Sequence, residues 1–85
     1  MMKPKKLQEL LASFLQENEL DIVYGTGAFS GGHCVINENR VVVVNKRIPI
    51  EEQLRVIVSV ILELELDYSS LKNEAKDYIE RYIKL

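Results

Sequence analysis

The 85-residue sequence contains a single cysteine, a single histidine and no tryptophan. One cysteine cannot form an intramolecular disulfide, whereas small secreted domains usually carry several, so we expect a reducing, cytoplasmic location. No apolar run approaches the ~18 residues that a membrane span needs. The apolar residues after the basic N-terminal segment are interrupted by glutamine and glutamate, unlike those of a signal peptide. The sequence therefore predicts a cytoplasmic protein with no membrane partner.

An excess of either charge is also lacking. The chain has 11 Lys and Arg residues against 13 Asp and Glu residues, which gives a net charge of -2. Because such a chain has no overall positive field to attract phosphates, nucleic acid is not an expected partner. The length predicts one domain, residues 1–85, and a chain this short buries only about 60–65% of its unfolded surface. Few of its apolar residues are therefore expected to lie outside the core.

Apolar residues at three- and four-residue spacing predict helices in three segments. The first runs from about Pro4 to Asn18. The second runs from about Pro49 to Leu66, because proline and two glutamates begin it as a helix N-terminus prefers. The β-branched middle of this segment leaves a strand as the alternative, which its length disfavours. The third helix follows Asp67, Ser69 and Ser70, whose oxygens are typical N-caps.

β-branched segments between the first two helices predict strands at Leu20–Tyr24, His33–Ile36 and Arg40–Val44. The last two flank the turn residues Asn37-Glu38-Asn39 and predict a hairpin. Residues 25–32 are rich in glycine and are expected to form a loop between the first two strands. We therefore expect an α+β fold of order α-β-β-β-α-α, with helices packed on a three-stranded antiparallel meander.

Four consecutive valines, Val41 to Val44, place two side chains on each face of their strand. A small antiparallel sheet normally needs only one dry face, so a helix or a second subunit is expected to cover the other. The second helix carries an additional apolar set, Val56, Val60 and Leu62, and is expected to be buried on two sides. The sequence therefore favours a homodimer, formed by strand-edge pairing or by helix packing.

The only histidine, the only cysteine and all four glycines lie between Gly25 and Cys34. Adjacent strand residues point to opposite faces, so His33 cannot act as a base for Cys34 unless the strand is bulged. We expect Cys34 to lie inward as a small hydrophobic residue and His33 to face outward. The alternative is that Gly31 and Gly32 present amides beside a Cys34 thiolate, which makes Cys34 the candidate catalytic residue.

Other chemistries are less well indicated. Structural zinc needs four ligands, and His33 and Cys34 supply two that face opposite ways, so no metal or other cofactor is expected. The binding candidates in the cysteine segment are Gly31, Gly32 and the outward-facing His33. The other binding candidates follow the valine strand: Asn45, Lys46 and Arg47. They offer an exposed contact for an anion or a partner, but Asn45 is as well suited to tying the strand to the following turn.

The motifs Phe29-x-Gly31-Gly32-x-Cys34 and Asn45-Lys46-Arg47-x-Pro49 resemble those of a group of short bacterial proteins. The resemblance covers about residues 24–85 and implies a bacterial cytoplasmic protein, without implying an activity. A looser likeness is to regulatory zinc metallopeptidases, in which a strand ending in Asn precedes a helix with H-E-x-x-H. Here that helix has no histidine, so the likeness implies topology only.

Together these patterns favour a non-catalytic interaction or structural module that acts as a homodimer. It would present its sheet, hairpin and glycine-rich loop to a protein partner. The alternative is a small thiol-dependent enzyme or sensor that uses Cys34 on an amide-lined loop.

Overall fold

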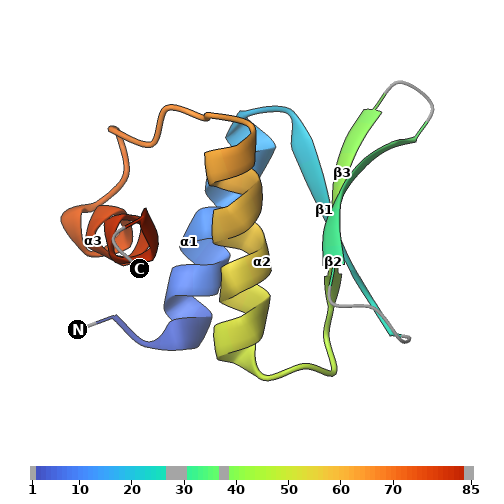
Figure 1. The fold of residues 1–85 in the computed structure, drawn as a ribbon, viewed down its shortest axis with the longest axis horizontal. Helices are drawn as coiled ribbons and strands as arrows, with labels where there is room; N and C mark the ends of the chain where they lie inside the picture. The colour runs from blue at the N-terminus through green and yellow to red at the C-terminus, as the bar shows by residue number, and fades with distance from the viewer. Residues whose placement is uncertain (1, 27–30, 37–38, 84–85) are drawn as a thin grey trace.

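The computed structural model describes residues 2–26, 31–36 and 39–83, with the side chains of residues 33–36 outside that description. The predicted α+β order is confirmed (Figure 1). The elements are α1 (Pro4–Glu17), β1 (Leu20–Gly25), β2 (Gly31–Ile36), β3 (Asn39–Asn45), α2 (Ile50–Glu63) and α3 (Asn73–Ile83).

The three strands form a mixed sheet of order β1-β3-β2. β2 and β3 form the predicted antiparallel hairpin, but β1 pairs with β3 in parallel, so the antiparallel meander is wrong. The valine-rich β3 is the central strand, with Val42 and Val44 fully buried on one face and Val41 8% exposed on the other. A meander would have placed the less apolar β2 there, whereas a strand that is buried on both faces belongs in the middle of the sheet.

The helices are arranged in layers on one side of the sheet (Figure 1). α1 and α2 lie next to the sheet, and α3 packs on them from the far side. Fully buried side chains from each layer meet in one core, which includes Leu11, Leu20, Val42, Ile57 and Ile79. α2 is thus buried on two sides, as its apolar circumference predicted.

α2 is a helix and not the alternative strand, although it ends earlier than predicted. Its last turn closes when the Leu64 N–H donates to the Val60 carbonyl at 2.9 Å and Glu65 takes a positive φ of 53°. α3 begins at Asn73, several residues after the predicted caps. The Asp67 carboxylate instead accepts the Ser69 N–H at 3.0 Å and forms a turn in the connection.

Candidate functional site

A cavity of about 400 Å³ lies between β2 and α2. We call it the β2–α2 groove. Gly31 and Gly32 line it from β2, and Ile48 lines it from the turn before α2. The α2 residues recur at three- and four-residue spacing and so form one stripe along the helix: Glu52, Val56, Ser59, Val60 and Glu63, with Arg55 beside them.

The α2 stripe gives the groove an apolar floor and a polar rim. Val60 is 1% exposed and Val56 is half-buried, whereas Glu52, Ser59 and Glu63 are exposed. The floor is formed by Val56 and Val60, which belong to the additional apolar set of α2 predicted from the sequence. The rim residues were missed, because glutamate and serine on an exposed helix face look like ordinary solvated positions.

Gly31 is required by the fold. Its φ of +131° lies in a region that side chains rarely adopt. A Cβ at this position would also stand 2.4 Å from the Val43 carbonyl oxygen and 3.0 Å from Val56 Cγ1. The missing side chain therefore lets β2 lie against both β3 and α2.

The fold does not require a glycine at position 32. A Cβ built on Gly32 meets no heavy atom within 4 Å among the described residues. Within a strand, a glycine weakens the structure and often marks a place where another backbone or a ligand approaches closely. In the hairpin register Gly32 is opposite Val43, so its Cβ position lies on the sheet face turned away from α2, and it borders the groove with its backbone.

β2 is also an edge strand, because the sheet order is β1-β3-β2. Its pairing with β3 uses one side of its backbone, and the edge of a sheet presents a row of N–H and C=O groups on the other. The groove is thus bounded by a strand edge on one side and by the α2 stripe on the other.

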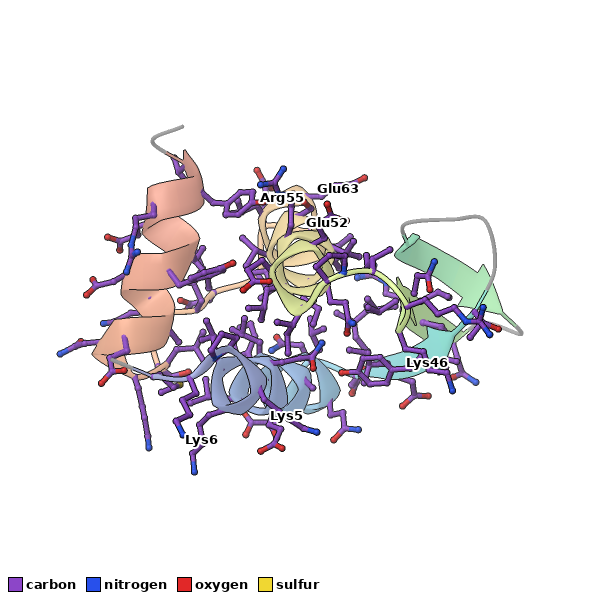
Figure 2. All side chains as sticks on the ribbon, turned by 90° about the horizontal axis from the view of Figure 1, so that it is seen from below. Lys5, Lys6, Lys46, Glu52, Arg55 and Glu63 are labelled. Atoms are coloured by element: carbon purple, nitrogen blue, oxygen red, sulfur yellow. The ribbon has the colours of Figure 1, made fainter. Side chains whose placement is uncertain are left out.

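The charged side chains of the groove differ in direction. The Arg55 guanidinium lies over the Tyr82 ring of α3, 5.7 Å from its centroid, so this cation is held toward α3. Figure 2 shows Glu52 and Glu63 on the part of α2 turned toward the sheet, with Arg55 on the α3 side of them. Among the described side chains, the carboxylates of Glu52 and Glu63 therefore lie nearer to the sheet than the Arg55 guanidinium does.

The other predicted candidates lie elsewhere. Asn45 is 4% exposed, and its Oδ1 accepts the Arg47 N–H at 2.9 Å. This hydrogen bond ties the strand to the turn, which is one of the two roles expected for Asn45. Lys46 and Arg47 are exposed but do not line the groove, and Lys46 lies on the opposite side of the molecule from Glu52 (Figure 2). The structure thus separates these residues from Gly31 and Gly32.

The glycine-rich segment is only partly a loop. Gly25 ends β1, while Gly31 and Gly32 belong to β2, so an amide-lined loop at these two glycines is wrong. In the register of the hairpin, His33 is opposite Val42 and Cys34 is opposite Val41. The predicted directions of the His33 and Cys34 side chains lie outside the described residues, as does Phe29.

Sequence reasoning missed a pair of glutamines that fixes the turn before α2. The buried Gln53 side chain donates from Nε2 to the Ile48 carbonyl at 2.9 Å and to the Lys46 carbonyl at 3.3 Å. Its Oε1 accepts from Gln8 Nε2 of α1 at 2.7 Å. A glutamine within an apolar helix stripe was the available signal, because a buried amide needs such partners. The pair holds Ile48 and the start of α2 at the end of the groove.

Within residues 2–26, 31–36 and 39–83, no three His, Cys, Asp or Glu side chains are grouped as a metal would require. Among the described helices, none combines the length and apolar character needed to cross a membrane. The fold and the groove together define a small α+β protein whose open site lies between an edge strand and a helix. No family model, curated protein or solved structure matches this chain. The resemblances drawn from its motifs therefore stay predictions.

Proposed function

We propose that this protein is a non-catalytic interaction module that binds an extended segment of a protein partner in the β2–α2 groove. The observation that carries the proposal is the edge strand β2, whose backbone borders the groove opposite the apolar residues Val56 and Val60 of α2. In such binding the segment adds a strand to the sheet edge, and pockets beside that edge receive alternate side chains. Val56 and Val60 form the apolar floor for those side chains.

The dimensions of the site suit this mode. β2 has six residues, which at ~3.3 Å per residue span roughly 20 Å. A cavity of about 400 Å³ lies within the ~300–1,000 Å³ range of small-ligand pockets and offers room for a few side chains beside the strand. Hydrogen bonds to the strand edge would supply affinity for any sequence, and the floor and rim would supply selectivity.

Selection of extended heptapeptides from a random displayed library tests the proposal. Selected peptides are expected to shift the amide resonances of Gly31 and Gly32 and to bind Val56→Asp at least ~10-fold more weakly, because a charge in the apolar floor disfavours burial of the peptide side chains. Gly32→Ala, which adds only a Cβ on the sheet face that carries Val43, serves as the control and should bind as the wild type does. Equal binding to the wild type and Val56→Asp would refute the proposal.

The thiol-dependent alternative is tested with the same peptides. If the module is non-catalytic, Cys34→Ala is expected to retain peptide affinity, and the native thiol is expected to react no faster than an ordinary cysteine at neutral pH. Fast thiol modification that is lost in the denatured protein would favour the alternative instead.

We also propose that the module is a homodimer, in which two copies meet through the sheet face turned away from the helices. On this face Val23 is 48% exposed and pairs with the half-buried Val43, while their neighbours Val42 and Val44 point into the core. Sheets pack face to face about 10 Å apart, which leaves the groove at the β2 edge open in each copy.

A further inference from the structure

Arg55 of α2 is shared between the β2–α2 groove and the last helix. Its side chain lines the groove, and its guanidinium lies 5.7 Å from the centroid of the Tyr82 ring on α3. The π face of an aromatic ring attracts a cation, so α3 and the groove compete for this charge. Figure 2 shows Arg55 on the α3 side of Glu52 and Glu63. The position of the cation is therefore set by a residue of another helix.

We propose that Tyr82 is a positioning residue for Arg55 and thereby sets how the β2–α2 groove discriminates acidic from neutral segments. By holding the guanidinium over its ring, Tyr82 keeps this positive charge away from a segment that lies along β2. This inference rests on the proposed function, because it concerns what the groove selects. Moving this one cation changes the affinity for an acidic segment relative to a neutral one, whatever other charges border the groove.

The ring of Tyr82 is held in place by packing. It is half-buried, packs against the hydrophobic core and lies 6.3 Å from the Tyr78 ring, with an angle of 42° between the two ring planes. The turn of α3 before it is anchored by the fully buried Ile79. Because close packing leaves such a ring few alternative positions, its face stays available to Arg55.

The Tyr82 hydroxyl takes no part in this arrangement. It is buried, and among the described residues it has no hydrogen-bond partner. A buried hydroxyl without a partner costs free energy, so its removal is expected to be neutral or stabilising. Phenylalanine lacks the hydroxyl but keeps the ring face that attracts a cation. Tyr82→Phe therefore separates the ring, which positions Arg55, from the hydroxyl, which does not.

Release of Arg55 would bring its charge to the groove. Arg55 is exposed, and Glu52 lies three positions earlier on the same helix, a spacing that allows an ion pair. Because Glu52 lines the groove, a guanidinium that turns toward it also turns toward the segment along β2. The competing partner is Glu51, four positions earlier, which lines a separate cavity with Tyr78 on the other side of α2.

Titration of the full-length ¹⁵N-labelled protein with two heptapeptides tests the inference. Both peptides keep the apolar residues of a selected peptide, and they differ only in carrying two Glu or two Gln residues. Tyr82→Leu removes the ring face but keeps apolar bulk. It is expected to raise the affinity for the Glu peptide, relative to the Gln peptide, by about threefold over the wild type. Tyr82→Phe is the matched control and should keep the wild-type ratio. Adding Arg55→Gln to Tyr82→Leu should abolish the gain.

The Nε–Hε resonance of Arg55 reports the stack without any peptide, because a proton over an aromatic ring is shifted upfield. This resonance is expected to be alike in the wild type and Tyr82→Phe and to move downfield in Tyr82→Leu. An Arg55 resonance that is the same in all three proteins would overturn the inference.

The peptide outcomes separate this inference from the proposal on which it rests. If neither peptide shifts the amides of Gly31 and Gly32, the proposed function fails and the positioning role falls with it. If both peptides bind but their affinity ratio is the same in the wild type and Tyr82→Leu, the groove function stands and the positioning role is wrong. Equal weakening of both peptides in Tyr82→Leu, or a gain that survives Arg55→Gln, would likewise overturn it.

Discussion

Gly31 and Gly32 are adjacent in β2, but only Gly31 is constrained by packing to be glycine. Gly31 has a φ that other residues avoid and a β-carbon position that is filled by Val43 and Val56. Among the described residues, nothing lies within 4 Å of the β-carbon position of Gly32, which is on the sheet face that carries Val43. The sequence motif alone did not distinguish the two glycines.

Substitution at the two positions is therefore expected to have unequal effects on stability. Gly31→Ala should lower the free energy of unfolding by about 2 kcal/mol or more, because it combines a strained φ with a backbone clash. Gly32→Ala should change it by less than about 1 kcal/mol. Urea denaturation followed by circular dichroism measures both. Similar losses in the two variants would contradict the structural distinction.

Gln53 is a second residue whose role is structural. Gln53→Ala leaves two turn carbonyls and the Gln8 amide without their partner, so a loss of about 1–3 kcal/mol is expected in the free energy of unfolding. Ser59→Ala on the same helix is the control, because the exposed Ser59 hydroxyl donates only to the Arg55 carbonyl one turn earlier. Its expected change is within about 0.5 kcal/mol. Equal stabilities of the two variants would show that the glutamine pair does not stabilise the turn.

At the scale of elements, local sequence patterns predicted the helices and the hairpin but not the order of the strands in the sheet. Periodic apolar residues gave the three helices, and turn residues gave the β2–β3 hairpin. The position of β1 was missed, because the alternation of side chains in a strand states which face is buried and not which strand lies beside it. The caps of α3 were misplaced because Asp67 and the serines also favour turns, and the turn prevailed.

The candidate site was predictable in part for the same reason. Gly31 and Gly32 were candidates from the sequence, and Val56 and Val60 were recognised as surplus apolar surface. That the two sets form one groove depends on how α2 packs against an edge strand, which no local pattern contains. Asn45, Lys46 and Arg47 lie near these glycines in the sequence but outside the groove in space.

The packing of α3 gives the fold a dependence on alkaline pH. Burial raises the pKa of Tyr78 above its ordinary value, and negative charge on Tyr82 and Glu51 adds to the rise, while Arg55 and Arg81 oppose it. Because the folded-state pKa is the higher one, the unfolded chain releases its proton first. Stability is therefore full below the ordinary value of about 10 and falls as the pH rises through the folded-state pKa.

Tyr78→Phe tests this dependence. The urea midpoint of the wild type is expected to fall between about pH 8 and pH 11, and that of Tyr78→Phe is expected to fall less, because phenylalanine has no proton to lose. Burial raises the pKa of Tyr24 as well, so part of the decline should persist in the variant. Parallel declines in the two proteins would assign the effect to groups other than Tyr78.

At the scale of the whole molecule, the fold has two faces with different uses. All three helices lie on one side of the sheet, with the groove at the β2 edge of that side (Figure 1). The opposite sheet face carries Val23 and Val43. A dimer through this face would present two grooves, and a ligand with two extended segments would then gain from an effective concentration without any new contact.

The proposed dimer can be tested with a matched pair of exposed apolar residues, Val23 on the sheet and Ile83 on α3. Sedimentation equilibrium at micromolar concentration is expected to give twice the chain mass for the wild type. Val23→Lys is expected to give a monomer, because it places two like charges in an apolar interface. Ile83→Lys is the control. Ile83 is more exposed than Val23, at 58% against 48%, but it belongs to α3, which lies on the far side of the molecule from the sheet. The Ile83→Lys variant should therefore remain dimeric. Because the groove is complete within one copy, the Val23→Lys monomer should bind a single extended peptide as tightly as the dimer does. A monomeric wild type, or dissociation caused by Ile83→Lys alone, would exclude the sheet face as the interface.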